Sequence, residues 1–397
     1  MGLRPQLLRA VRELGFTTPT PVQSAAIPPA LAGRDVLASA KTGSGKSAAF
    51  GLPLLEALAG QPRGTTRALI LAPTRELAAQ IAEHLSALAA HTGVKVAAVY
   101  GGVGFGAQAA AFKRGTDIIV ATPGRLQDHL NQRTADLRSI RYLVLDEADR
   151  MLDMGFLPTV RRLLGYLPRE RQTLFFSATI PGAIAGLVKE MLHDPVRIAL
   201  SGPSGAPAGG ITQTVYSIDQ TRKVDLFLEL LKDNAIYSAI AFTRTKARAN
   251  RLAAALSKNH VLADRIHGDR SQAQRTRTLA DFKRGKFRVL VATDIAARGI
   301  DIEALGHVVN YDVPMVPEDY VHRIGRTARA ELTGDAITFV SGDEEKYFSQ
   351  IERTIGKRLD RTKNPPLPDA AVALTPQPRE AREQRHAGRA REHSRRR

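Results

Sequence analysis

The sequence predicts two α/β domains, each a parallel sheet covered by helices, joined by a flexible linker and followed by a disordered basic tail. Three observations predict this architecture. Short apolar runs alternate with helical patterns in both halves, a stretch of small residues and prolines separates the halves, and the last segment is rich in arginine without any aromatic residue. Strands that are apolar throughout belong to sheets buried on both faces, which are typically parallel.

The first domain is expected over residues 1–200. Helical patterns, such as residues 75–90 and 157–166, separate its strands. We expect seven strands, at residues 35–39, 68–72, 94–100, 117–121, 142–145, 173–176 and 196–200.

The second domain is expected over residues 211–360, after a linker at 201–210 in which every residue is small or proline. Residues 361–397 carry ten basic and four acidic groups and too little apolar surface to fold, so we expect a disordered tail. This tail would either hold nucleic-acid phosphates or simply aid solubility. The six strands of the second domain are expected at 211–218, 238–242, 263–267, 288–292, 307–311 and 335–340.

Composition narrows the class of protein. A net charge of +18 favours a polyanionic partner, although an arginine-rich proteome would produce the same excess. The absence of cysteine excludes disulfides, thiolate metal sites and a cysteine nucleophile, and fits a reducing compartment. No run approaches 18 apolar residues and the start lacks a signal-peptide core, so a cytoplasmic protein without a membrane span is expected.

A phosphate-binding loop is predicted after the first strand, where Gly43-Ser44-Gly45-Lys46-Ser47 leads into a helical pattern. Glycines let backbone N–H groups approach phosphate oxygens at the positive end of a helix dipole. Lys46 would reach the β- and γ-phosphates, and the Ser47 hydroxyl would ligate Mg²⁺. The alternative is a glycine-containing turn before a helix.

A second candidate site follows the fifth strand, which ends in Asp146-Glu147-Ala148-Asp149. Ligands of parallel α/β sheets bind beyond the carboxyl ends of the strands. Asp146 would hold Mg²⁺, and Glu147 would polarise the attacking water as general base. The alternative is an acidic helix N-cap, which favours the same residue types.

These residues resemble the DEAD-box RNA helicase family, because Asp146–Asp149 spell its signature and its other motifs occur in the expected order. The resemblance covers residues 3–355 and is greatest to the bacterial RhlE-type branch. The matching segments are 15–16 with 19–23 (Q motif), 73–78 (Ia), 101–102 (GG), 122–125 (Ib), 177–179 (III), 241–245 (IV), 272–275 (QxxR), 292–301 (V) and 322–329 (VI).

The resemblance implies two RecA-like domains that bind ATP, Mg²⁺ and RNA across their cleft. It implies that Gln23 reads adenine, although a polar residue at a helix N-terminus is the alternative, and that Asp146 holds Mg²⁺ through water. The remaining nucleotide-side residues that it implies are Phe16, Thr42, Gly43, Ser44, Gly45, Lys46, Ser47 and Asp301 for ATP binding, Arg326 and Arg329 as arginine fingers, and Ser177, Thr179 and His322 for coupling ATP to RNA.

On the RNA side the resemblance implies contact with phosphate and ribose, which is independent of base sequence and favours RNA through the 2′-OH. A plain turn role is the alternative for each of these residues, which are Pro73, Thr74, Arg75, Gly102, Thr122, Gly124, Arg125, Thr243, Gln272, Arg275 and Thr293.

The expected function is an ATP-dependent RNA helicase. RNA-stimulated hydrolysis would drive domain closure, local unwinding of short duplexes and ribonucleoprotein remodelling. An ATP-dependent RNA clamp and a DNA translocase are the alternatives. Ribosome-assembly and RNA-decay proteins are partners compatible with the family.

Overall fold

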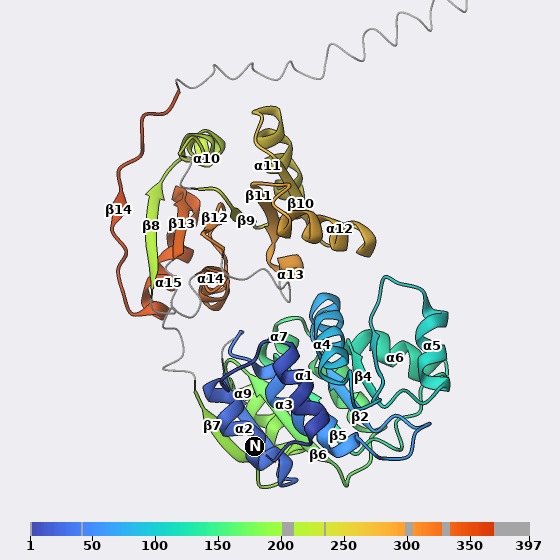
Figure 1. Cartoon of the computed structure of the whole chain (residues 1–397). Helices are drawn as coiled ribbons and strands as arrows, with labels where there is room; N and C mark the ends of the chain where they lie inside the picture. Colours follow the sequence, from blue (N-terminus) through green and yellow to red (C-terminus); the bar gives the residue numbers. More distant parts are fainter. Residues whose placement is uncertain are drawn as a thin grey trace, which may run out of the picture.

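The computed structural model confirms two parallel α/β sheets covered by helices (Figure 1). It describes residues 2–40, 43–200, 210–233, 236–297, 305–327 and 334–368. Predictions for Thr42, Asp301, Arg329, linker residues 201–209 and tail residues 369–397 lie outside the described residues.

The first sheet has seven parallel strands in the order β3-β4-β2-β5-β6-β1-β7. All seven expected strands are present, with ends that differ from the expected ones by at most two residues. Their bounds are β1 Val36–Ser39, β2 Ala68–Leu71, β3 Val96–Val99, β4 Ile118–Ala121, β5 Tyr142–Leu145, β6 Gln172–Ser177 and β7 Val196–Ala199.

In the described part of the first domain, nine helices accompany this sheet. Their bounds are α1 Pro5–Glu13, α2 Pro21–Leu31, α3 Lys46–Leu58, α4 Arg75–Leu88, α5 Phe105–Lys113, α6 Pro123–Asn131, α7 Ala148–Asp153, α8 Leu157–Leu164 and α9 Gly182–Met191.

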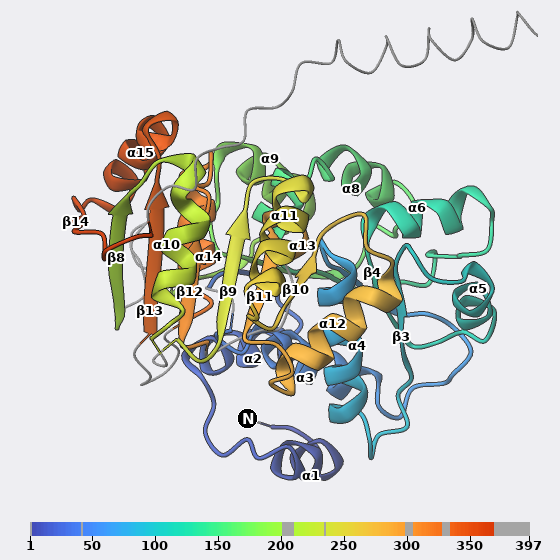
Figure 2. The ribbon, with the colours of Figure 1, turned by 90° about the horizontal axis from the view of Figure 1, so that it is seen from above.

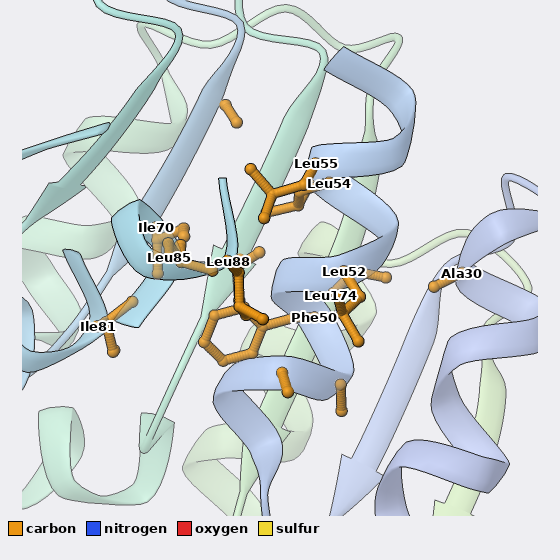
Figure 3. Packing of buried hydrophobic residues seen from close by; sticks show 14 of the residues in the cluster. Ala30, Phe50, Leu52, Leu54, Leu55, Ile70, Ile81, Leu85, Leu88 and Leu174 are labelled. Carbon is orange, nitrogen blue, oxygen red and sulfur yellow. The ribbon is translucent and has the colours of Figure 1, made fainter. Parts of the chain in front are cut away.

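The central strands are buried on both faces, which explains their apolar sequence. Successive side chains of a strand point to opposite faces. In β2, Ile70 packs into a cluster with Phe50 and Leu85 on one face (Figure 3), whereas Leu69 and Leu71 belong to a separate cluster on the other. The two clusters hold the sheet between two helical layers, so its carboxyl edge is a fixed platform for the loops that follow.

The second sheet is also seven-stranded and parallel, in the order β10-β11-β9-β12-β13-β8-β14 (Figure 2). Its strands are β8 Ile211–Ser217, β9 Ala239–Thr243, β10 Ala263–Ile266, β11 Val289–Thr293, β12 His307–Asn310, β13 Gly334–Val340 and β14 Arg361–Thr362. Its helices are α10 Lys223–Leu230, α11 Lys246–Lys258, α12 Gln272–Lys283, α13 Asp294–Ala297, α14 Pro317–Ile324 and α15 Glu345–Ile355, with 3₁₀ turns at Gln220–Arg222 and Gly342–Glu344.

Placing the start of the tail at residue 361 is wrong, because the second domain extends to residue 368. β14 pairs with β8, and the Arg361 guanidinium lies 2.9 Å from Glu345 and 4.6 Å from the ring centroid of Phe348. Asn364 Nδ2 donates to Ser217 O at 2.8 Å. A two-residue strand before prolines has no pattern that predicts it, since its pairing with β8 and its contacts with Glu345 and Phe348 are distant in sequence.

Removing residues 361–397 should therefore destabilise the second domain, whereas removing 369–397 should not. The shorter deletion keeps β14, the cation–π contact and the ion pair, which together contribute about 1–2 kcal/mol. Urea denaturation checks this, with the deletion of 369–397 as the matched control. Equal unfolding midpoints for the two truncated chains would contradict the assignment of 361–368 to the domain.

Candidate functional site

The predicted phosphate loop follows β1 and ends at the first turn of α3. Gly43 and Gly45 have φ of 77° and 92°, in the left-handed region that favours glycine. A Cβ on Gly45 would also lie 2.6 Å from Gln23 Nε2. The 13-residue α3 begins at Lys46, so its unpaired N–H groups and positive dipole end lie at the loop. This is the arrangement that binds phosphate.

Lys46 and Asp146 form a buried pair at the carboxyl edge of the first sheet. Lys46 Nζ lies 3.6 Å from Asp146 Oδ1, and the two side chains are 5% and 3% exposed. Within the described part of the chain, Lys46 Nζ is buried without a hydrogen-bond partner. Buried ammonium donors are normally satisfied, so the site fits the oxygens of a nucleotide phosphate.

Burial also sets the protonation of Asp146. It raises the pKa of this carboxyl to about 6, while the charge of Lys46 opposes the shift and that of Glu147 adds to it. A cation bound beside Asp146 would favour the ionised form.

Glu147 is the N-cap of α7 and has a left-handed conformation, with φ 52° and ψ 52°. Such a conformation is rare for a residue with a side chain and is often found at functional sites. Its N–H donates to Asp146 Oδ1 at 3.0 Å, and its Oε2 accepts from Arg150 Nη1 at 3.0 Å. The carboxylate is thereby held next to Asp146, in a position suited to a general base.

Asp149 ties this loop to the end of β6. Its N–H donates to Ser177 Oγ at 3.1 Å, and its Oδ2 accepts from the Thr179 N–H at 2.9 Å and from Thr179 Oγ1 at 3.1 Å. The two hydroxyl residues predicted to couple ATP to RNA therefore both contact Asp149, Ser177 at its backbone N–H and Thr179 at its carboxylate.

Gln23 connects α2 to the phosphate loop. Its Oε1 accepts from the Thr20 N–H at 3.0 Å, which is half of a helix capping box, and its Nε2 donates to Gly45 O at 3.2 Å. The helix N-terminal role that we kept as the alternative is therefore present, together with a contact to the loop. Phe16 is 43% exposed, with its ring edge-on to His84 at 5.8 Å.

In the second domain, Arg323 on α14 is the centre of a buried hydrogen-bond set. Its Nε and Nη2 donate to the two oxygens of Asp294 at 2.6 and 2.8 Å, a bidentate geometry. Its guanidinium carbon lies 5.0 Å from the ring centroid of Phe242. This fixes α14, and with it Arg326, which follows the helix and is buried.

The two domains meet beside this helix. A small pocket is lined by Arg150 of the first domain and by Asp294, His322 and Arg326 of the second, among others. Burial lowers the pKa of His322 to about 4, and the charge of Arg150 acts in the same direction. His322 is therefore neutral near pH 7.

A second contact between the domains is made by Glu76 on α4. Its Oε1 accepts from Gln272 Nε2 and from Arg275 Nη2, each at 3.0 Å. Gln272 and Arg275 lie three residues apart on one face of α12, so both reach the same carboxylate. Burial lowers the pKa of Arg275, and Glu76 opposes the shift.

Two predicted RNA residues of the first domain instead shape the loop around Gly102, which has φ 83°. Arg75 packs so closely against this glycine that a side chain there would collide with it. Arg125 Nε donates to Tyr100 O at 3.2 Å, and its Nη2 donates to Val103 O at 2.5 Å. Both arginines thus hold the loop open to solvent at the carboxyl edge of the sheet.

The other predicted RNA residues lie at strand ends. Thr74 and Thr122 are the N-caps of α4 and α6, and Thr293 ends β11. Pro73 is buried and Gly124 is half-buried.

Three of the residues predicted to bind RNA have side chains with partners inside the protein. Thr243 is fully buried, and its hydroxyl donates to the carbonyls of Thr245 and Ala292 at 3.4 Å. Gln272 and Arg275 are engaged by Glu76. Burial at the end of a strand explains the contacts of Thr243, and a partner in the other domain explains those of Gln272 and Arg275. Neither cause is visible in a local motif.

Sequence reasoning missed four residues of the site: Glu76, Arg150, Thr245 and Arg323. Glu76 and Arg323 lie within motifs that we identified, so their charge was a usable signal. Thr245 is the exposed N-cap of α11, the position that serine and threonine favour. The contact of Arg150 with Glu147 had a local signal, since the two lie three residues apart, whereas its place beside the second domain had none.

The fold and the site define a nucleoside triphosphatase whose phosphate loop is in the first of two RecA-like domains, with Arg326 of the second domain in a pocket shared with Arg150 of the first. The family model "DEAD/DEAH box helicase" matches residues 20–186, and "Helicase conserved C-terminal domain" matches residues 222–331.

Similar proteins include the DEAD-box ATP-dependent RNA helicase CshA of Bacillus subtilis, at 42% identity over 93% of this chain and 74% of that protein. The ATP-dependent RNA helicase CshA of Listeria monocytogenes is 44% identical over 93% of this chain and 71% of that protein. S. cerevisiae Dbp5 bound to RNA and ADP BeF3 has a TM-score of 0.80 and 31% identity, over 91% of this chain and 93% of that one. Mss116p bound to ssRNA and AMP-PNP has a TM-score of 0.82 and 29% identity, over 92% of this chain and 78% of that one.

The chain belongs to the family of DEAD-box ATP-dependent RNA helicases. The expected likeness to the RhlE-type branch is not supported, because these bacterial relatives are CshA proteins. Among the described helices, none is long and apolar enough to cross a membrane.

Replacing Gly45 by alanine should lower nucleotide affinity at least about tenfold, or about 1.4 kcal/mol. Its φ of 92° and the 2.6 Å approach to Gln23 Nε2 leave no room for a methyl group. Binding of a fluorescent ATP analogue measures the effect. Gly104→Ala is the control, since nothing lies within 4 Å of its Cβ. An affinity for Gly45→Ala equal to that of the control would show that the loop tolerates a side chain.

Proposed function

We propose that ATP and RNA binding close the two domains of this helicase, and that closure separates short RNA duplexes locally and remodels ribonucleoproteins. One observation carries the proposal. His322 and Arg326 of the second domain lie in one pocket with Arg150, which is paired with Glu147 of the first domain. Residues from both domains therefore surround the general base.

In this mechanism Lys46 binds the β- and γ-phosphates, with the loop N–H groups of Gly43, Ser44 and Gly45. Its buried Nζ, which has no hydrogen-bond partner among the described residues, supports this role. Gln23 and Phe16 would hold adenine. Thr42 would extend the phosphate cradle, and Asp301 would hold the ribose.

Ser47, and Asp146 through water, would hold Mg²⁺, which when bound neutralises charge on the phosphates. Within the described ranges no three His, Cys, Asp or Glu residues cluster as a metal cage. That agrees with Mg²⁺, which is usually held by one or two carboxylates together with substrate phosphates.

Hydrolysis would require both domains. Glu147 orients and deprotonates the attacking water, while Arg326 and Arg329 stabilise charge on the transferred phosphoryl group. Arginine fingers contribute on the order of 10³–10⁵ in rate in related enzymes. An open chain would therefore hydrolyse ATP slowly, and RNA that bridges the domains would stimulate hydrolysis.

RNA would lie along the carboxyl edges of both sheets, with contacts to phosphate and ribose. Backbone N–H groups of the Gly102 loop and the N-termini of α4, α6 and α11 suit such contacts. The similar structures of Dbp5 and Mss116p contain RNA, which supports RNA as the ligand. Ribosome-assembly or RNA-decay proteins would be partners, and a cytoplasmic location remains a prediction from the sequence.

Glu147→Gln should bind ATP and RNA with nearly unchanged affinity but release phosphate at least about 100-fold more slowly, because general base catalysis contributes roughly 10²–10⁴. RNA-stimulated phosphate release and nucleotide binding measure the two effects. Glu190→Gln, at an exposed position on α9, is the control. Turnover of Glu147→Gln at the wild-type rate would remove Glu147 as base.

Strand displacement separates a helicase from the alternatives. The wild-type chain with Mg-ATP should displace a short RNA duplex at a rate that follows phosphate release. RNA binding without displacement would indicate a clamp, and equal stimulation by DNA would indicate a DNA translocase.

Deleting residues 369–397 should weaken RNA binding and flatten its dependence on salt. The segment carries eight arginines and four acidic residues, and each phosphate contact that is lost lowers the salt slope by about 0.7 for single strands. RNA affinity measured from low to high salt checks this. If the salt dependence of RNA affinity is unchanged by the deletion, residues 369–397 do not bind RNA and serve only to aid solubility.

A further inference from the structure

Five charged side chains of the second domain form one network, which we call the charge network: Lys223, Arg244, Arg248, Asp312 and Glu344. The side chains of Lys223, Asp312 and Glu344 have no exposed surface, whereas the two arginines are about one-quarter exposed. Arg244 lies in a family motif identified above, and the other four residues do not. Charges are rarely this deep unless they are paired.

Lys223 lies at the centre of the charge network. Its Nζ donates to Tyr311 O at 2.8 Å, pairs with Glu344 Oε2 and lies 3.7 Å from Asp312 Oδ1. Glu344 Oε1 in turn accepts from Arg244 Nη2 at 2.8 Å and from the Val313 N–H at 3.2 Å. Lys223 therefore clamps the ends of β12 and β13 to each other.

Asp312 connects two loops of different function. Its Oδ2 accepts from the Arg244 N–H at 2.8 Å, and its Oδ1 pairs with Arg248 Nη1 at 2.5 Å, which holds the start of α11. Its backbone carbonyl accepts from Arg323 Nη1 at 2.7 Å, which holds α14. The side chain of Asp312 thus fixes the start of α11, which we call the RNA edge because RNA is proposed to bind there. Its main chain fixes α14, the helix before Arg326.

Arg323 extends this connection to the catalytic arginine. Its carbonyl accepts from the Arg326 N–H at 3.1 Å, so a shift of Arg323 moves Arg326. Its bidentate pair with Asp294 reaches the residue that follows Thr293 of β11. The start of α11, the end of β11 and Arg326 are therefore joined by direct contacts.

The charges of Asp312 and Glu344 do not require the buried ammonium group of Lys223. The charge network has three cations against two carboxylates, and each carboxylate already has an arginine within 2.8 Å. Burying an additional ammonium group is costly, and such groups are poor evidence of stability. What Lys223 adds is a fixed relation between Tyr311, Asp312 and Glu344.

We propose that Asp312 and Lys223 are positioning residues that transmit RNA binding at the start of α11 to Arg326. The inference rests on the proposed function, because it assigns the route by which the second domain couples RNA to ATP hydrolysis. Neither residue touches nucleotide or RNA. Each acts by keeping the RNA edge and α14 in one rigid arrangement.

The test uses the full chain with the double substitution Lys223→Met/Asp312→Asn, which removes one charge of each sign and keeps the net charge of the network. Glu229→Gln/Lys232→Met is the matched control, since it removes an ion pair at the surface of the same domain, in which Lys232 is exposed and Glu229 half-buried. The readout is the ratio of RNA affinities, for a fluorescent single-stranded RNA, with and without ADP–beryllium fluoride. A smaller folded fraction would not change this ratio.

In the charge-network variant, the ratio of RNA affinities with and without ADP–beryllium fluoride should fall at least about tenfold, and so should RNA-stimulated phosphate release. Its RNA affinity without nucleotide should stay within about twofold of the wild-type value. The control should match the wild type in each. A wild-type ratio in a folded charge-network variant would overturn the inference. If the wild type itself shows no RNA-stimulated phosphate release, the proposed function fails instead.

A single Lys223→Met variant keeps an arginine beside each carboxylate of the charge network. It should lose less of the ratio of RNA affinities than the double variant does. A wild-type ratio in this single variant would contradict the role of Lys223.

Discussion

The division of the nucleotide site between two domains is the constraint on which the rest of the structure depends. In the proposed mechanism the first domain supplies Lys46, Asp146 and Glu147, and the second supplies Arg326. Neither domain alone holds the whole set. Among the described residues, the contacts between them include polar ones: Glu76 with Gln272 and Arg275, and the pocket beside Arg150. Because such contacts are weak compared with an apolar core, closure can be reversible and can be controlled by ligands.

Parallel sheets make this arrangement possible. In each domain the carboxyl ends of the strands lie on one edge, so residues far apart in sequence meet there. In the first domain Ser39 of β1 lies opposite Ser177 of β6, which places the phosphate loop beside the loop that contacts Asp149. In the second domain Asp312, after β12, reaches both α11 and α14. The same edges carry the proposed nucleotide contacts and the proposed RNA contacts, so a rigid sheet relates the two.

The sequence predicted the parts of this molecule that depend on local pattern. Apolar strands predicted both sheets, and Gly43, Gly45 and Lys46 predicted a loop that the structure shows with the required backbone. Contacts between distant segments were not predictable. Nothing near Thr243 shows that its hydroxyl is buried by β11, and nothing near Gln272 shows that Glu76 of the other domain lies opposite. β14 was missed for the same reason, since Arg361 is held by Glu345, Phe348 and β8 rather than by its neighbours.

Measuring the distance between the domains tests most directly whether RNA and ATP together bring Arg326 to Glu147. The chain has no cysteine, so Lys189→Cys and Lys258→Cys, at exposed positions in the first and second domains, give two unique sites for a dye pair. Single-molecule energy transfer should show a compact state that becomes dominant only when RNA and ADP–beryllium fluoride are both present. A compact population that is the same with and without RNA, in a protein whose phosphate release RNA stimulates, would contradict the account.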